Sequence, residues 1–473
     1  MSDTADSQQK HADELYAEEG VWHVNVDAGT VFAKRIPGKY RTIKWFTMST
    51  WLIFFLGPYL RWGDRQAVLL DIPARQFHIF DITILPQDVW LLSLTLLFFA
   101  ILLAVVTSIA GRVFCGYFCF QTVWTDIFTL IEEKIEGNPS KRRKLKDAPL
   151  DAHKLRLRAT KYFFWLIISM LTGISFAAWF TDAYELWQSY LTLSASSVAW
   201  IVLGLFTAGT FILAGFMREQ VCFWLCPYAR IQGVMYDRET ILPTYDFNRG
   251  EPRGKLKKGE TEAGNGDCID CHQCVAVCPT GIDIRDGQQE GCITCSLCLD
   301  ACDAVMDKIG KPHGLIRYAS LDEIEGHPTK PFWKRARPLV YLSIMVIAAA
   351  GILYGLTHLG SMELKVIHER SPLFVQLSDG SIQNRFDIKI LNKQDKQIRV
   401  WLTAEGPEGL ELIGADEPLD VDSGKLRSHI VYIKVPRQNL LQSRTPLTFV
   451  VSNVNDPKDV VRYEGAFFSP RRQ

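Results

Sequence analysis

The run Cys268-Ile-Asp-Cys271-His-Gln-Cys274-Val-Ala-Val-Cys278-Pro279 decides the fold of the middle of this chain. Its spacing, C-x2-C-x2-C-x3-C-P, is typical of bacterial ferredoxins, and it returns without the proline at Cys292, Cys295, Cys298 and Cys302. Three cysteines in one loop reach three corners of a cubane, and the fourth reaches the other cubane. We therefore predict two 4Fe-4S clusters, one held by Cys268, Cys271, Cys274 and Cys302, the other by Cys292, Cys295, Cys298 and Cys278.

Zinc ribbons are the alternative for such a segment, but they need four cysteines per site in two pairs, and the third cysteine of each triplet argues against them. The second run ends Cys302-Asp303 instead of Cys-Pro. Because the proline turns the chain and is not a ligand, the ligand prediction stands, although local potential or solvent access could differ. His272, inside the first triplet, is interpreted as an exposed spacer.

Two more cysteine pairs follow apolar runs, in Arg112-Val-Phe-Cys115-Gly-Tyr-Phe-Cys119-Phe and Glu219-Gln-Val-Cys222-Phe-Trp-Leu-Cys226-Pro. If helical, the i, i+4 spacing places both sulfurs of a pair on one face. Two apolar runs and a pair, followed by two more runs and a pair, indicate an internal duplication. Four thiolates could then meet across a pseudo-twofold axis.

Soft thiolates select Cu(I), zinc or iron–sulfur clusters. We therefore predict that Cys115, Cys119, Cys222 and Cys226 form a metal or redox site. One alternative is that these cysteines are small buried hydrophobic residues beside aromatic ones. A dithiol–disulfide couple is the other.

Composition and hydropathy indicate a membrane protein. The 473 residues are 48% hydrophobic, and 52 Lys and Arg balance 52 Asp and Glu, so no charge excess favours a nucleic-acid partner. Apolar runs long enough to cross a hydrocarbon core of about 30 Å lie at 44–60, 89–110, 162–181, 197–217 and 339–359. The polar residues before them predict an uncleaved N-terminal tail.

Lysine and arginine are unevenly distributed among the predicted loops, which sets the orientation. They are dense before the first run, between the second and third, and before the fifth, whereas the loop 182–196 has none. We predict a multi-pass protein of the bacterial inner membrane, in contact with membrane lipid, with a cytoplasmic N-terminus and a periplasmic C-terminal domain. All twelve cysteines then face the cytoplasm, where thiols stay reduced.

Beyond residue 361 the chain alternates apolar and polar residues in short runs, at 385–391, 398–403, 429–434 and 447–451. Turn signals such as Asp379-Gly380 separate them, which predicts an immunoglobulin-like sandwich. This domain shows no catalytic constellation, so we interpret it as a docking module. His78 and His358 could bind metal, haem or quinone, but a surface or interface position is favoured.

With these cysteine pairs, the paired cluster motif, the stretch Cys302-Asp-Ala-Val-Met-Asp-Lys-Ile-Gly-Lys-Pro-His-Gly-Leu-Ile-Arg-Tyr318 and the sandwich, the chain resembles the CcoG family, also called FixG or RdxA. The resemblance covers nearly the whole chain and is most specific over 222–318. It implies an accessory protein that reduces Cu(II) to Cu(I) for the assembly of cbb-type cytochrome c oxidase. It further implies assembly factors and copper transporters or chaperones as partners, and the pairs 115/119 and 222/226 as the copper-reducing site. A more distant likeness is to membrane ferredoxin subunits that pass quinol electrons to periplasmic reductases.

We therefore predict a multi-domain membrane protein with a five-helix transmembrane bundle, a bacterial-ferredoxin-like insert and a C-terminal all-β sandwich. Its parts are a cytoplasmic tail (1–43), four transmembrane helices (44–217), a cytoplasmic ferredoxin-like domain (218–338), a fifth transmembrane helix (339–359) and a periplasmic immunoglobulin-like domain (360–473). The predicted activity is that of a cupric reductase supplied by a separate electron donor. The alternatives are a quinol-linked electron conduit and a copper-holding assembly scaffold.

Overall fold

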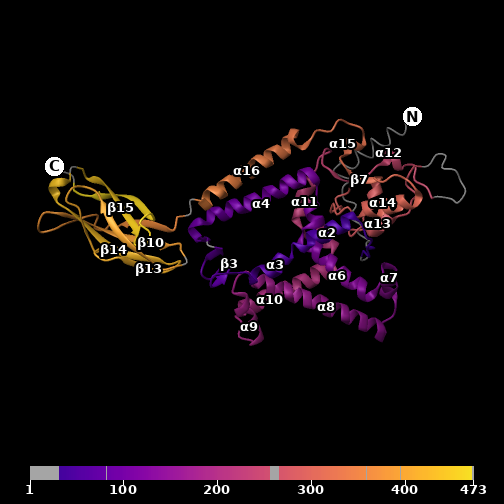
Figure 1. The fold of residues 1–473 in the computed structure, drawn as a ribbon, viewed down its shortest axis with the longest axis horizontal. Coiled ribbons are helices and arrows are strands. Elements are labelled where there is room, and N and C mark those ends of the chain that lie inside the picture. The colour runs from indigo at the N-terminus through magenta and orange to yellow at the C-terminus, as the bar shows by residue number, and fades with distance from the viewer. Residues whose placement is uncertain are drawn as a thin grey trace. The chain divides into compact units, whose positions relative to one another are not determined.

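The computed structural model describes residues 31–80, 82–255, 266–357, 360–394, 396–440 and 442–470. They form two compact units (Figure 1). The first unit takes its described residues from 1–60 and 93–350, and the second takes them from 61–92 and 351–473. Each unit is therefore built from two separate stretches of chain.

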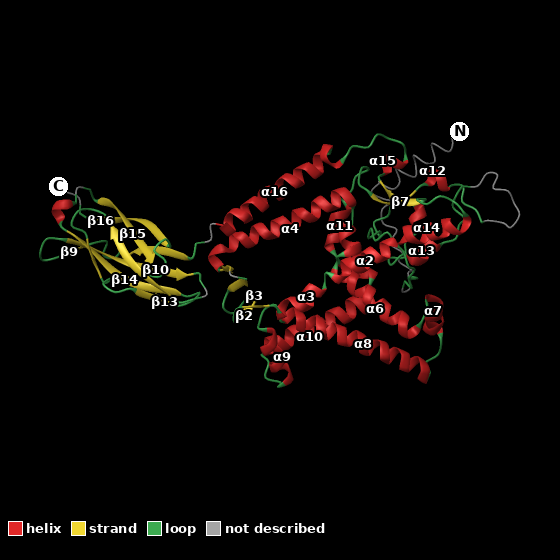
Figure 2. Cartoon of the chain, in the orientation of Figure 1, coloured by secondary structure: helices red, strands yellow, loops and turns green. Residues whose placement is uncertain are grey.

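Helices dominate the first unit (Figure 2). Its aromatic core stacks Phe120 on Trp124 and Phe128 on Trp165, with ring centroids 4.1 and 5.0 Å apart. The helices up to the insert are α2 (Lys39–Ser49), α3 (Leu52–Leu56), η1 (Gly57–Tyr59), α4 (Val89–Ala110, which begins in the second unit), α5 (Val113–Tyr117), α6 (Phe120–Glu136), α7 (Pro139–Asp147), α8 (Ala152–Ala177), α9 (Ala183–Leu191), α10 (Ser197–Ile212) and the π-helices η3 (Leu213–Met217) and η4 (Val221–Leu225).

Within the described residues, four helical segments are long and apolar enough to cross a membrane: Val89–Ala110, Ala152–Ala177, Ser197–Met217 and Ala336–Thr357. The predicted count of five is not confirmed, because the first predicted run is divided among α2, α3 and η1. At the break, the hydroxyls of Ser49 and Thr50 each donate to a carbonyl three residues earlier, at 2.6 Å. Such bonds compete with the regular helical pattern.

The insert follows η4 and consists of short elements around two cysteine-lined cavities. Strands β6 (Leu242–Tyr245) and β7 (Ile316–Ala319) pair antiparallel, with Leu242 opposite Ala319. Leu299, Met306 and Leu315 are part of the buried core beside this pair. The helices are α11 (Pro227–Gly233), α12 (Phe247–Gly250), α13 (Gln273–Val277), η5 (Ile284–Asp286), α14 (Leu297–Ile309), α15 (Leu321–Ile324) and η6 (Phe332–Lys334), followed by α16 (Ala336–Thr357).

Residues 31–44, here called the N-terminal arm, tie the insert to the helices. The backbone N–H of Lys34 donates to the carbonyl of Ala276 at 2.7 Å. At the start of α2, the N–H groups of Tyr40 and Arg41 donate to the carboxylate of Asp300 on α14, at 3.1 and 2.9 Å. Asp300 therefore caps a helix that lies about 260 residues earlier in the sequence.

The second unit contains the predicted sandwich. One sheet has the order β12-β14-β10-β8 with β9 beside β10, and the other has the order β13-β11-β15-β16. Ile388, Val431 and Phe449 are fully buried between them, and the prediction of an immunoglobulin-like fold is confirmed. The strands are β8 (Met362–His368), β9 (Val375–Gln376), β10 (Ile382–Asn392), β11 (Ile398–Glu405), β12 (Glu411–Ile413), β13 (Leu419–Val421), β14 (Leu426–Val435), β15 (Arg444–Asn453) and β16 (Val460–Phe468), with η7 (Arg437–Asn439).

The stretch 61–92 also belongs to this unit. Its Gln76 donates to the carbonyl of Gly424 at 3.1 Å, and Lys393 pairs with Asp88 at 3.0 Å. His78 is buried, with Nδ1 3.0 Å from the Thr83 hydroxyl, which suits a structural role, whereas His358 lies outside the described residues. The elements are β1 (Arg61–Trp62), β2 (Arg65–Gln66), β3 (Val68–Asp71), β4 (Gln76–Ile79), β5 (Ile82–Ile84) and η2 (Pro86–Asp88).

Candidate iron–sulfur and thiolate sites

The first set of four cysteines lines one cavity. Cys268, Cys271, Cys274 and Cys302 all lie on the wall of a cavity of about 360 Å³. Burial and, after it, the neighbouring groups Cys274, Asp303, Cys271 and Cys268 raise the pKa of Cys302 to about 12. The structure thus brings together the four residues that the sequence spacing groups.

The second set lines a neighbouring cavity of about 350 Å³, whose wall includes Cys278, Cys292, Cys295 and Cys298. Burial and the nearby thiols, Cys295 first, raise the pKa of Cys298 well above its ordinary value. Cys274 lines both cavities, so the two cysteine sets adjoin each other.

The cysteine runs form two loops, the first ligand loop (268–274) and the second ligand loop (292–298), and these have the same backbone shape. Asp270 and Thr294, each two residues after the first cysteine of a run, have φ of 53° and 55°. His272 and Ser296, each after the second cysteine, have φ of 52° and 59°. Non-glycine residues rarely adopt this left-handed conformation, so its recurrence at matched positions indicates two copies of one ligand loop.

The donor set suits iron–sulfur clusters. Eight cysteines in two adjoining cavities supply the four thiolates that each 4Fe-4S cluster requires. Burial holds the pKa of Cys274, Cys292 and Cys302 at about 12, so these thiols keep their protons at neutral pH until iron binds.

His272 is exposed as predicted, but it has partners. Its Nδ1 lies 2.7 Å from Nη2 of Arg285, and its Nε2 lies 3.2 Å from Asp270. Arg285 also binds Asp283 and Asp270, and the hydrogen bond to Asp283 is the largest influence raising its pKa. The first ligand loop is therefore held by an ion cluster that the sequence did not reveal.

The two Cys-x3-Cys pairs meet near the ends of α4 and η3. Burial and, after it, the thiols of Cys119, Cys115 and Cys226 raise the pKa of Cys222 to about 12. Cys115 has a pKa of about 12 for the same first reason, lowered in part by Arg112. The thiol of Cys222 is therefore close enough to the other three cysteines to be influenced by each of them. Within the described ranges, no group of three or more His, Cys, Asp or Glu side chains surrounds a single metal ion, whereas a 4Fe-4S cluster takes its four cysteines at four separate irons.

The pairs do not lie along single α-helices. Cys115 is in α5, but Cys119 is the extended N-cap residue of α6. Cys222 is in the π-helix η4, and Cys226 is the extended N-cap residue of α11. The two cysteines of a pair therefore do not share one face of a single helix. In both pairs, the first cysteine lies in a short helix and the second lies at the N-terminus of the next helix.

Helix α5 packs directly on the second ligand loop. A Cβ on Gly116 would lie 2.5 Å from the carbonyl oxygen of Ile293 and 3.0 Å from Cα of Cys295. The hydroxyl of Tyr117 donates to the carbonyl of Cys295 at 3.2 Å. Cys115 therefore lies close to the cavity lined by Cys278, Cys292, Cys295 and Cys298, because the two residues that follow it contact the ligand loop.

Two polar side chains complete this contact, and sequence analysis missed both. Arg112 donates to the carbonyl of Glu290, next to the ligand loop. The Sγ of Cys115 lies 3.1 Å from Oε1 of the fully buried Gln232. Arg112 could have been noted as a cation just before a cysteine pair, whereas nothing in the sequence connects Gln232 to residue 115.

Family models match three regions of the chain. Residues 217–321 match the 4Fe-4S dicluster domain, and residues 92–138, which include Cys115 and Cys119, match a 4Fe-4S binding domain. Residues 352–470 match the immunoglobulin-like fold at the C-terminus of FixG. Iron–sulfur binding is thereby supported for the insert.

Relatives in two bacteria resemble most of the chain. It is 44% identical over 394 residues to RdxA of Cereibacter sphaeroides, covering 80% of this chain and 83% of RdxA. It is 45% identical over 401 residues to RdxB of the same organism, covering 81% and 84%. It is 41% identical over 415 residues to the nitrogen fixation protein FixG of Rhizobium meliloti, covering 80% and 79%.

Proposed function

The chain belongs to the FixG and RdxA family of membrane iron–sulfur proteins, and on that premise we propose that it reduces Cu(II) to Cu(I) at Cys115, Cys119, Cys222 and Cys226. The Cu(I) would serve assembly of a cbb-type cytochrome c oxidase. In this proposal the thiols bind copper, and the insert supplies the electrons. The proposed orientation has the cysteines in the cytoplasm and residues 360–473 in the periplasm.

The contact of Gly116 and Tyr117 with the loop 293–295 is the observation that carries the proposal. It holds Cys115 beside the cysteine set that contains Cys295. The proposed copper site and a proposed iron–sulfur cluster are therefore neighbours. The proposed ligands are Cys268, Cys271, Cys274 and Cys302 for one 4Fe-4S cluster, and Cys278, Cys292, Cys295 and Cys298 for the other. When bound, such clusters accept and donate single electrons.

The chemistry needs one electron for each copper ion. Cu(II) gains that electron and becomes Cu(I), no bond within a substrate is broken, and a one-electron reductant outside the chain must restore the electron. Thiolates favour Cu(I) over Cu(II), because the thiolate and Cu(I) are both soft. The thiol protons of Cys115 and Cys222 leave when copper binds, since only a thiolate ligates.

The test is a single-turnover assay on anaerobically purified full-length protein. The protein is reduced with dithionite and desalted, and Cu(II) is then added with a Cu(I)-specific chelator. Wild type and the control Trp224→Phe, an exposed residue of η4, should form Cu(I) as the iron–sulfur absorbance returns to the oxidised state. Cys226→Ser and Cys115→Ser should lose at least about 90% of this rate while keeping their iron, because a thiolate ligand is gone.

Equal rates in wild type and both serine variants would refute the thiol site. No Cu(I) from any of them would instead favour the copper-holding scaffold. Electron transfer that requires quinol and tolerates Cys226→Ser would favour the quinol conduit.

A further inference from the structure

A cavity of about 660 Å³ lies in the first unit between the N-terminal arm, α6 and the insert. Cys222 is on its wall, and so are Pro279 and Thr280, which follow Cys278. The cavity therefore borders one thiol of the proposed copper site and the segment that follows Cys278, a proposed ligand of the second cluster.

Positive charge predominates on the cavity wall. Four cations, Arg35, Arg41, Lys44 and Arg218, line it together with two carboxylates, Asp126 and Glu219. Asp126 is shared by three of the cations: Arg35 binds it, and Arg41 and Lys44 each reach it at 3.1 Å. Burial alone would raise the pKa of Asp126, but Lys44, Arg35 and Arg41 hold it at about 2. Burial raises the pKa of Glu219.

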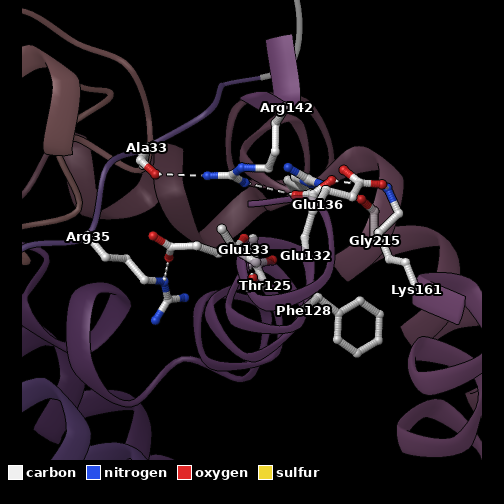
Figure 3. Close-up of polar contacts among 12 residues, drawn as sticks. Ala33, Arg35, Thr125, Phe128, Glu132, Glu133, Glu136, Arg142, Lys161 and Gly215 are labelled. Atoms are coloured by element: carbon white, nitrogen blue, oxygen red, sulfur yellow. Dashed lines mark hydrogen bonds and ion pairs between the residues drawn. The ribbon is translucent and has the colours of Figure 1, made fainter. Parts of the chain in front are cut away.

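The fourth cation, Arg218, forms an ion pair with Glu132 on α6. Nη2 of Arg218 lies 2.9 Å from Glu132, and the same carboxylate accepts from Arg142 at 3.1 Å and Lys161 at 3.2 Å. Figure 3 shows Arg142 reaching the carbonyl of Ala33 as well, which ties this network to the arm. Lys161 has a second carboxylate, Glu136, at 2.6 Å. One carboxylate thus holds three cations in place.

Several donors at the cavity have no partner. Nη1 of Arg35, Nε of Arg41 and Nη1 of Arg218 are buried without a hydrogen-bond acceptor anywhere in the part of the chain that the structure describes. Arg218 as a whole is only 5% exposed. An unmatched buried donor costs about 1–3 kcal/mol, and more when it is charged. Three arginines that line the cavity therefore carry buried donors without an acceptor, which favours an anion as the ligand.

We propose that this cavity binds a phosphate group, supplied either by a phospholipid headgroup or by free phosphate. Guanidinium groups offer paired N–H donors that match phosphate oxygens. The Thr122 and Thr125 side chains also line the cavity and carry hydroxyl groups. Basic pockets beside transmembrane helices on the cytoplasmic side are known sites for anionic lipid headgroups. The proposal does not depend on copper.

The test compares wild type with Arg41→Gln and with Arg143→Gln, which removes the same charge from an exposed position on α7. Arg41→Gln leaves Asp126 paired with Arg35 and Lys44, so the fold should be retained, and iron content verifies this. Each full-length protein is purified in neutral detergent. Native mass spectrometry then counts retained phospholipid, and equilibrium dialysis measures the binding of radiolabelled inorganic phosphate.

For a lipid headgroup, wild type and Arg143→Gln should retain one phospholipid that Arg41→Gln loses. For free phosphate, wild type and Arg143→Gln should bind one phosphate, and Arg41→Gln should bind it at least about tenfold more weakly. Absence of both ligands from iron-replete wild type would overturn the proposal. Equal retention or binding in all three proteins would also overturn it. Neither readout involves copper, so a failed reductase assay leaves this result unaffected.

Discussion

The two cysteine-pair segments, 111–119 and 218–226, follow one backbone plan and differ in what surrounds them. Four residues before the first cysteine, both segments take a positive φ, 61° at Gly111 and 47° at Arg218. Both then form a short helix and place the second cysteine at the start of the next one. The shared plan supports the internal duplication on geometry, beyond the repeated Cys-x3-Cys spacing.

The residue after the first cysteine shows the difference. Gly116 lets the backbone of α5 touch the backbone of the insert at Ile293. Phe223 instead places its ring against a glycine of the insert, since a Cβ on Gly291 would lie 3.0 Å from that ring. The first segment is thus fixed against the ligand loop by close backbone contact. The second, in a π-helix with Trp224 and Leu225 exposed, is held by a side chain and borders the cavity.

The two segments therefore share a backbone plan around their cysteines, while the neighbouring positions make different contacts. Irregular π-turns are frequent at functional sites, and a positive φ on a non-glycine residue costs about 1–3 kcal/mol. Arg218 accepts this conformation with its Nε donating to the Gly215 carbonyl at 2.8 Å and its Nη2 bound to Glu132. We therefore expect the first segment to control position and the second to control ligand binding.

The largest expected effect is on iron. Wild type should contain about eight iron and eight sulfide per chain, and Cys271→Ser or Cys295→Ser should each remove about half, because a cubane needs all four ligands. Cys295→Ser should also expose the first segment to proteolysis, since Tyr117 and Gly116 contact residue 295. Iron and sulfide analysis with limited proteolysis provides the check. Full iron in either variant would refute the ligand assignment.

Gly116→Val should be nearly as damaging. Its side chain would meet the backbone of Ile293 and Cys295, which cannot move aside as a side-chain end can. We expect a loss of about 3 kcal/mol in stability and reduced iron content. Thermal unfolding in detergent measures this, with Phe118→Leu, an exposed residue of the same segment, as the control. A Gly116→Val protein as stable as that control would show that the backbone contact is unimportant.

Arg218→Met should have an intermediate effect. Glu132 keeps Arg142 and Lys161, so the charge is not left unpaired, and we expect a loss of about 2 kcal/mol. Arg143→Met, which removes an exposed cation, should cost under about 0.5 kcal/mol. If the two variants unfold alike, the second segment does not depend on the ion network around Glu132.

Phe223→Ala should have the smallest effect. The ring is half-buried, so its removal should cost about 1 kcal/mol and leave iron content unchanged. Unfolding of Phe223→Ala beside Gly116→Val compares the two equivalent positions directly. A larger loss in Phe223→Ala would reverse the assignment of the positioning role to the first segment.

Local spacing explains what could be predicted from the sequence. The spacing of the cysteine runs groups the same residues that line each cavity in the structure. This was possible because each ligand loop is formed by a short continuous stretch of sequence. Alternating residues likewise predicted β10, β11, β14 and β15 of the sandwich. Four of the predicted membrane runs correspond to long apolar helices.

The remaining features depend on contacts between distant residues. The stretches rich in Lys and Arg that predict the orientation also contain cations that form ion pairs with Asp126 or Glu132, namely Arg35, Arg41, Lys44, Arg142 and Lys161. The four acidic residues of α6, Asp126, Glu132, Glu133 and Glu136, were the only signal for this. The role of Gly116 had none, because a glycine shows its purpose only when its neighbour in space is known. The cavity beside Cys222 was invisible for the same reason.

The N-terminal arm has a consequence for the timing of synthesis. It is synthesised before the insert, and Asp300, which caps α2, follows about 260 residues later. At translation rates of roughly 5–20 residues per second, that interval is on the order of 13–50 s. During this time α2 lacks its cap, and the partners of the arm on the insert do not yet exist. The arm can therefore dock fully only on a chain in which the second cysteine run has already been made.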